Sequence, residues 1–182
     1  TATDQSVTTD EDTAEAITLG GTDPENDSLT FTYDQPAHGT VDGTAPNVTY
    51  HPAANYNGPD SFTFTVDDGN GGTDDGTVSI TVTAVDDPPA FKKGADQTVD
   101  EDAGAQTVAN WATGISAGPA GESGQTVTFV VTNNTNTGLF SAGPAVAADG
   151  TLTYTPRANA NGSATITLKL SDSGGAESAT QS

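Results

Sequence analysis

Carboxylate side chains gather at three places in this sequence, each within a stretch rich in turn-forming residues. The first cluster is Asp10-Glu11-Asp12, the second combines residues 23–27 (DPEND) with Asp67-Asp68, and the third is Asp86-Asp87. Calcium takes about six to eight oxygen ligands, mostly carboxylates and carbonyls, at about 2.3–2.6 Å. Short acidic runs in turns supply such oxygens, so the clusters indicate calcium as the ion that the chain would bind.

The chain as a whole is strongly acidic. Its 25 Asp and Glu residues against 4 Lys and Arg give a formal net charge of −21 over 182 residues. Such a surface repels nucleic acid and anionic lipid and attracts cations. No apolar stretch approaches the roughly 20 residues that span a bilayer, which argues against direct membrane insertion. The alternative interpretation of the acidity is solubility alone, in an extracellular or salt-exposed protein.

The sequence offers no pattern for catalysis. It has no Cys and only two His, His38 and His51, so the usual zinc sites are not expected. Residues 121–124 (GESG) lack the Gly-x-Ser-x-Gly spacing of a nucleophile elbow, and no phosphate-binding loop is present. We therefore predict that the chain is not an enzyme.

The sequence contains an internal repeat of two similar units. Residues 48–58 (VTYHPAANYNG) match residues 152–162 (LTYTPRANANG), and each copy has an earlier Asp-Glu-Asp motif, at 10–12 and at 100–102. The Asp-Glu-Asp motif repeats after 90 residues and the later motif after 104, so the second copy has 14 additional residues. We expect them in the Gly/Ser-rich run 114–124, either alone or together with residues 133–136. Two units of this size, at residues 1–87 and 88–182, are each long enough for one β-sandwich.

Alternation of apolar and polar residues predicts strands throughout. Leu29, Phe31 and Tyr33 share one face of a strand, as do the apolar residues of 62–66 and of 78–82. Connections rich in Gly, Asn, Asp and Pro separate these runs, which is the spacing of a sandwich. The predicted fold is all-β: two tandem seven-stranded Greek-key sandwiches, the second lacking its last strand. That lack would leave an open sheet edge or a frayed tail, and an open edge invites self-association.

Two single residues admit a functional and a structural interpretation. Trp111, the only tryptophan, is expected to anchor the core of the second unit, the alternative being a platform for a sugar ring. Lys169 could in principle form an isopeptide bond, but the alternation of its strand turns it away from the apolar face of residues 166–170, which favours an exposed lysine.

Several of these segments resemble cadherin repeats. Residues 85–91 (VDDPPAF) look like the inter-repeat linker of cadherins, Asp-x-Asn-Asp-Asn-Ala-Pro-x-Phe, and residues 21–31 (GTDPENDSLTF) are similar to an acidic segment of the same family. Both copies more closely resemble the bacterial Ig-like tandem repeats of about 95 residues in giant surface proteins and RTX-type adhesins. The resemblance implies a rod of Ig-like or cadherin-like repeats, stiffened by calcium at the junctions, on a cell surface or secreted.

The resemblance also implies ligands. Glu11 matches the glutamate at the base of a cadherin repeat, Asp86 and Asp87 match linker ligands, and Asp172 matches the aspartate after the penultimate strand. Asp60 stands near the position of the family's Asp-Arg-Glu segment, although that motif is absent. A second set would form a pole at the other end of the first unit: Asp23, Glu25, Asp27 and Asp68.

Departures from the cadherin pattern keep alternatives open. Pro88 follows Asp87 where cadherins have Asn, and the insertion 114–124 offers only Glu122 as an acid. The junction would then hold fewer ions than in cadherins, or it would be a solvated acidic linker extended by self-repulsion. The expected function is a structural spacer and adhesion module with neighbouring repeats as partners; the alternative is an accessory module that binds a cell-surface carbohydrate or protein.

Overall fold

The computed structural model describes all residues from 1 to 182 and divides into two compact units. Unit 1 comprises Thr1–Val85 and unit 2 comprises Asp86–Ser182, so Asp86 and Asp87 lie in unit 2, ahead of the boundary predicted after residue 87. The predicted all-β fold is confirmed, because the only helices are two single 3₁₀ turns, η1 (Ala120–Glu122) and η2 (Thr137–Leu139).

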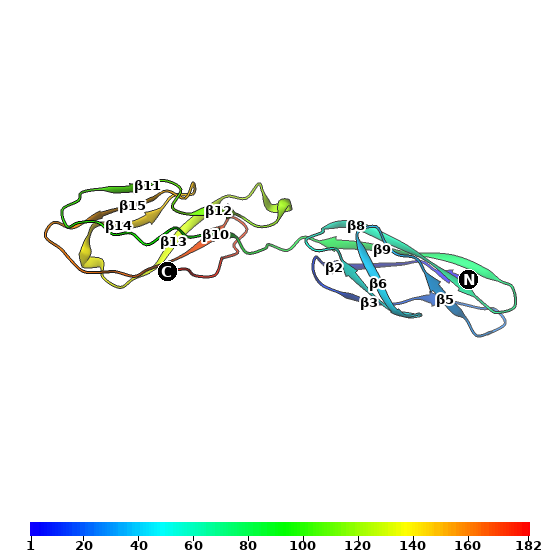
Figure 1. Ribbon diagram of the computed structural model, residues 1–182. Helices are drawn as coiled ribbons and strands as arrows, with labels where there is room; N and C mark the ends of the chain where they lie inside the picture. The colour runs from blue at the N-terminus through cyan, green and yellow to red at the C-terminus, as the bar shows by residue number, and fades with distance from the viewer. The chain divides into compact units, whose positions relative to one another are not determined.

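Unit 1 is a sandwich of two main sheets (Figure 1). One sheet has the order β2-β9-β8-β5, in which β2 pairs with β9 in parallel and the other neighbours are antiparallel. The other sheet has the order β3-β7-β6, and a small ribbon joins β1 to β4. The strands are β1 (Ala2–Thr3), β2 (Gln5–Asp10), β3 (Glu15–Thr18), β4 (Gly20–Gly21), β5 (Thr30–Tyr33), β6 (Gly39–Thr44), β7 (Asn47–Pro52), β8 (Gly58–Asp67) and β9 (Thr73–Thr83).

The alternation in the sequence accounts for the core of unit 1. Side chains of β8 and β9 alternate between the sheet faces, and those facing inward are fully or almost fully buried. The core comprises Ile17, Leu19, Val41, Val48, Tyr50, Phe62, Phe64, Val66, Val78, Ile80 and Val82.

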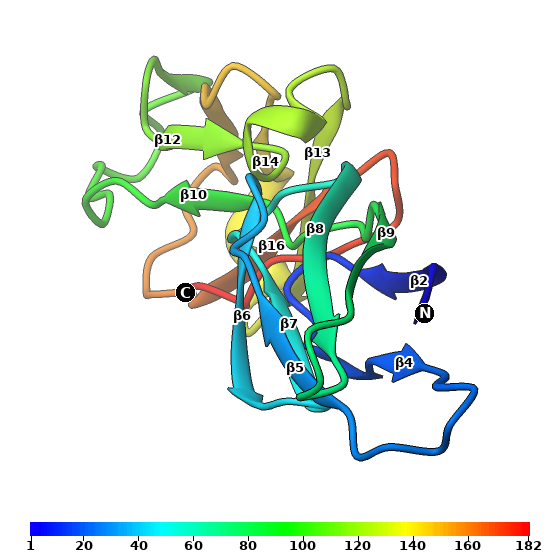
Figure 2. The ribbon, with the colours of Figure 1, turned by 90° about the vertical axis from the view of Figure 1, so that its right-hand side faces the viewer.

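Unit 2 repeats this plan in smaller sheets. Figure 2 shows β10 beside β12, and the remaining pairs form the sheets β11-β15-β14 and β13-β16. The strands are β10 (Ala90–Lys92), β11 (Gln106–Val108), β12 (Thr113–Ser116), β13 (Val127–Asn134), β14 (Phe140–Val146), β15 (Leu152–Pro156) and β16 (Ile166–Asp172). Unit 1 has nine named strands and unit 2 has seven, so the predicted number of seven in each sandwich is not confirmed.

The core of unit 2 is smaller than that of unit 1. It is formed by Phe91, Ala112, Leu168 and Leu170, and half-buried Trp111 packs against this cluster, as expected for a core anchor. The indole Nε1 of Trp111 donates a 2.9 Å hydrogen bond to the carbonyl of Ala95. Trp111 is therefore a natural spectroscopic reporter of unit 2.

The last ten residues of unit 2 lie along β16. They form isolated bridges, Leu168 with Gln181 and Ser171 with Glu177, and no named strand. Leu168 and Gln181 exchange both of their backbone hydrogen bonds, at 2.9 and 2.8 Å. The segment is thus held on β16, and the expectation of a frayed tail is not met.

Candidate cation site

Asp86, the first residue of unit 2, is held by two other segments of that unit. Its Oδ1 accepts a 2.7 Å hydrogen bond from Nε2 of Gln125, and its Oδ2 accepts a 2.9 Å hydrogen bond from the backbone N–H of Ala176. Gly174 lies so close that a methyl group at its position would overlap the Asp86 carboxylate. The side chain is half-buried, and both of its oxygens are placed by these contacts.

Asp172 stands at the end of β16 and is only 8% exposed. Its Oδ1 accepts hydrogen bonds from the backbone N–H groups of Gly175 and Ala176, at 2.8 and 2.9 Å. Its Oδ2 is buried and has no hydrogen-bond partner. Because Ala176 N–H donates to both Asp86 and Asp172, these two carboxylates lie side by side.

A third carboxylate comes from η1. Oε1 of Glu122 accepts a 2.9 Å hydrogen bond from the backbone N–H of Asp87, and Oε2 is buried without a partner. Gln125, just after η1, accepts a 3.0 Å hydrogen bond from Gly174 N–H. The start of unit 2, the η1 loop and the turn after β16 are thus tied together around Asp86, Glu122 and Asp172.

The carboxylates of Asp86, Glu122 and Asp172 have no positively charged side chain beside them. None of the ion pairs in the protein involves Asp86, Glu122 or Asp172. A buried carboxylate oxygen without a partner is costly, because it has given up its water without replacement. Carboxylate oxygens of this kind are ligands that calcium prefers, so the types of residue present fit calcium. As the side chains stand, no group of three or more acidic or histidine residues lies close enough together to hold a metal ion.

The sequence predicted Asp86, Asp87 and Asp172 as ligands but gave no such role to Glu122. Asp87 lies beside the group through its backbone, and its carboxylate makes no hydrogen bond. The signal for Glu122 was its position as the only acid in the inserted run 114–124. Its closeness to Asp87 follows from the tertiary fold alone.

The remaining acids expected at the junction belong to unit 1. Glu11 is 7% exposed, and its Oε1 accepts a 2.7 Å hydrogen bond from Val85 N–H. The neighbouring carboxylates of the Asp-Glu-Asp motif are also in use, since Asp10 accepts from the hydroxyl of Thr83 and Asp12 accepts from Asn55 N–H. This motif therefore fastens the end of β2 within unit 1.

Asp60 is fully engaged inside unit 1. Its two oxygens accept hydrogen bonds from three backbone N–H groups and from the hydroxyl of Tyr50, which lies 2.9 Å away. Burial, and then the hydrogen bond to Asp60, raise the pKa of Tyr50 well above its usual value. This pattern is that of a structural carboxylate whose lone pairs are already in use.

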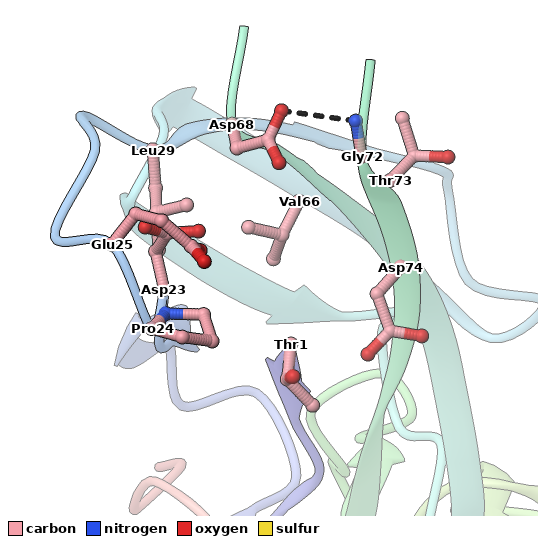
Figure 3. Close-up of a pocket in the computed structure, with 10 residues that line it drawn as sticks. All are labelled: Thr1, Asp23, Pro24, Glu25, Leu29, Val66, Asp68, Gly72, Thr73 and Asp74. Carbon is pink, nitrogen blue, oxygen red and sulfur yellow. Dashed lines mark hydrogen bonds between the residues drawn. The ribbon is translucent and has the colours of Figure 1, made fainter. Parts of the chain in front are cut away.

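The second predicted set surrounds a pocket of about 390 Å³ in unit 1 (Figure 3). Asp23, Glu25 and Asp68 line it together with the apolar side chains of Leu29 and Val66. Asp27 does not line the pocket; its carboxylate accepts a 2.7 Å hydrogen bond from Asn70. Asp74, which the sequence did not single out, also lines it and accepts a hydrogen bond from Ala2 N–H.

Asp68 and Asp172 are equivalent in the repeat, 104 residues apart. The backbone N–H groups of Asn70 and Gly72 lower the pKa of Asp68, since they stabilise its charged form. The pocket of unit 1 and the carboxylate group of unit 2 therefore lie at the same end of their respective sandwiches. The pocket acids are exposed or half-buried, whereas Asp172 and one oxygen of Glu122 are buried.

The fold and the repeat define a class: a tandem pair of Ig-like β-sandwiches. The model of the family described as "Bacterial Ig domain" matches residues 1–81 and 86–182, so the chain belongs to the bacterial Ig domain family. This confirms the resemblance to bacterial Ig-like tandem repeats. None of the curated proteins matches the chain.

A solved cadherin structure shares the fold. Mouse cadherin-23 EC22-24 is 15% identical with a TM-score of 0.50, the alignment covering 96% of this chain and 61% of that one. The protocadherin GammaB4 extracellular domain is 16% identical with a TM-score of 0.46, covering 97% and 32%. An endo-fucoidan hydrolase of glycoside hydrolase family 107 is 20% identical with a TM-score of 0.37, covering 96% and 26%. The chain thus spans between about a quarter and three fifths of these structures. It contains no helix with the length and apolar character needed to cross a membrane.

Proposed function

We propose that this chain is a structural spacer and adhesion module of a secreted or cell-surface repeat protein, without enzymatic activity, in which calcium stiffens the chain where the two units join. Both units belong to the bacterial Ig domain family, which supports the role of a spacer made of repeated domains. Neighbouring repeats of the same chain are then its first partners.

One observation carries the calcium part of this proposal: the buried, unpartnered oxygens of Asp172 and Glu122 beside Asp86. Calcium bound there would have to draw these three carboxylates closer together than they stand without the ion, with Asp87 next to them. Glu11 stays a ligand predicted from the sequence, within unit 1 only. We assign Asp60 a structural role because its oxygens are already occupied.

The bound ion would supply positive charge that the site lacks. Asp86 belongs to the segment that joins the units, Glu122 to η1, and Asp172 to the end of β16. Holding all three side chains on one ion restricts the motion of the joining segment relative to the sandwich of unit 2. That restriction is the physical basis of the proposed stiffening.

The test is a thermal unfolding experiment that follows Trp111 fluorescence, which reports unit 2 alone. Extracellular calcium modules typically bind with a Kd of about 10⁻⁴–10⁻³ M. At ten times that concentration, one site adds about 1.4 kcal/mol to the free energy of unfolding. For a unit of this size the melting temperature should rise by about 5–10 °C in calcium over EDTA. An equal rise in magnesium would show ordinary charge screening and contradict the proposal.

Stiffening is measured separately. Because the chain has no Cys, spin labels can be placed by Thr32→Cys in unit 1 and Thr153→Cys in unit 2, both at exposed strand positions. Electron double resonance then measures the distribution of distances between the two labels. Calcium should make this distribution narrower. If the distribution stays equally broad while calcium still raises the melting temperature, calcium binds to unit 2 but does not stiffen the chain.

A further inference from the structure

Strand β13 of unit 2 is an open sheet edge. It pairs with β16 on one side, and no strand pairs with its other side. Its sequence VTFVVTNN contains no Pro, and it is the longest strand without a charged residue. Val130 and Val131 are each 38% exposed, among the few large apolar side chains at the surface. Long uncharged edges of this kind are templates for pairing with another strand.

Unit 1 protects the equivalent edge. Phe31 of β5 lies opposite Val66, and Phe129 of β13 lies opposite Leu170, which identifies the two strands as counterparts. β5 has only four residues and is followed at once by Asp34, whose carboxylate accepts a hydrogen bond from Thr63. In unit 2 the counterpart of Asp34 is the uncharged Thr132. The acidic residue that keeps strands from adding to β5 is therefore missing at β13.

The charge of the chain restricts where two copies can meet. With a net charge of −21, copies repel one another over most of their surface. Lys169, opposite Val130 on β16, is neutralised by Glu177 at 2.6 Å, so the neighbourhood of Val130 carries no uncompensated charge. β13 offers a second copy an approach free of this repulsion.

The sequence of β13 is also complementary to itself. Antiparallel pairing centred on Val130 places Val130 opposite its own copy, Phe129 opposite Val131, and Thr128 opposite Thr132. Apolar pairs and Thr–Thr pairs across strands are favourable combinations. The register shift between Val131 and Asn133 leaves Thr132 outside the regular ladder with β16, so the closest pairing is confined to residues 129–131. The arrangement has the two-fold symmetry of a closed dimer.

We propose that β13 is a self-association edge, through which two copies of this chain join their unit 2 sheets as antiparallel strands centred on Val130. This surface differs from the edge beside β16 that the sequence had suggested for self-association. The edge includes no residue of the candidate cation site. The proposed self-association is therefore tested independently of calcium binding.

The oligomeric state gives the first test. Sedimentation velocity in EDTA, from about 10 μM to 1 mM protein, should show a monomer–dimer equilibrium that strengthens between 0.05 and 0.5 M NaCl, because salt screens the acidic surfaces. Val130→Lys places two like charges opposite each other and should weaken the dimer by about tenfold or more. Thr32→Lys, at the counterpart position of β5, should leave it unchanged. A monomer under all conditions, or a dimer unaffected by Val130→Lys, would overturn the proposal.

Cross-linking tests the register. Opposed residues of antiparallel strands have Cα atoms about 4.5–5.5 Å apart, within the range of a disulfide. Val130→Cys should therefore give a disulfide-linked dimer on mild oxidation. Thr128→Cys, exposed on the same strand, would be about four residues from its own copy, roughly 14 Å, and should not cross-link. Equal cross-linking of both variants would exclude this register.

Discussion

Tyr50 donates a hydrogen bond to Asp60 within unit 1, and this pair has no counterpart in unit 2. Tyr154 occupies the equivalent position 104 residues later, but its buried hydroxyl has no partner, because Ala164 stands where unit 1 has Asp60. Asp60 also accepts hydrogen bonds from Ala37, His38 and Ser61 N–H. The two copies therefore share a tyrosine but differ in the polar network that holds it.

Removal of the Asp60 carboxylate should destabilise unit 1. Asp60→Ala leaves three backbone N–H groups and the Tyr50 hydroxyl without their acceptor, which should lower the free energy of unfolding by about 3 kcal/mol. Denaturant unfolding followed by circular dichroism measures this loss, while Trp111 fluorescence should be unchanged. Asp42→Ala, at an exposed position, serves as control and should cost about 0.5 kcal/mol or less. If Asp60→Asn abolished the rise in melting temperature that calcium produces, Asp60 would be a calcium ligand, which contradicts its structural role.

The raised pKa of Tyr50 predicts an alkaline loss of stability. In the unfolded chain a tyrosine ionises near pH 10, whereas the folded protein keeps Tyr50 protonated to higher pH. Above about pH 10 the unfolded state therefore binds fewer protons than the folded state, and the free energy of unfolding falls as pH rises.

The melting temperature of unit 1 between pH 9 and 11 measures this effect. Tyr50→Phe should make the decline shallower, and it should also lower stability at pH 7 because Asp60 loses one donor. If wild type and Tyr50→Phe lose stability in parallel above pH 10, Tyr50 is not the titrating group.

The proposed cation site predicts that two variants of different kinds lose the same calcium-dependent stabilisation of unit 2. Asp172→Asn removes one charge from the site, whereas Gly174→Ala changes no charge but displaces the Asp86 carboxylate, with which the new methyl group would overlap. Both should lose most of the calcium-dependent rise in the unit 2 melting temperature. Asp100→Asn, an exposed acid of unit 2, should keep it. A normal response in Gly174→Ala would show that Asp86 is not a ligand.

Asp12 and Asp102 make the same hydrogen bond in the two units. Oδ1 of Asp12 accepts from Asn55 N–H at 3.0 Å, and Oδ1 of Asp102 accepts from Asn159 N–H at 2.9 Å. Both aspartates have a positive φ, 57° and 65°, which Asp and Asn tolerate better than Ala.

Each Asp→Ala variant should therefore destabilise its own unit by about 1–2 kcal/mol and leave the other unit unchanged. Asp12→Asn and Asp102→Asn keep both the acceptor and the tolerance of positive φ, so their effect should be much smaller. The Trp111 signal assigns the loss to unit 2 for Asp102→Ala. Equal losses in the Ala and Asn variants would show that charge, rather than this hydrogen bond, is what matters.

The sequence by itself determined the class of fold, because strand alternation and an internal repeat are local properties. Phe62, Phe64 and Val66 point inward as their spacing predicts, and the repeated Asp-Glu-Asp motifs indicate that the chain contains two copies of one unit. Acidic clusters were likewise visible in the sequence. Their division into carboxylates that are saturated with donors and carboxylates that keep an unpartnered oxygen was not visible, because it depends on which donors the fold brings to each oxygen.

Only the tertiary structure decided that division. Asp60 is saturated by N–H groups of residues 37 and 38, more than 20 positions away, whereas Asp172 retains a buried oxygen without a donor. Glu122 meets Asp87 across 35 residues, and Asp86 meets Ala176 across 90. Hydrogen bonds between such distant segments have no local signature, because they arise from the sheet topology that returns β16 and η1 to the start of unit 2.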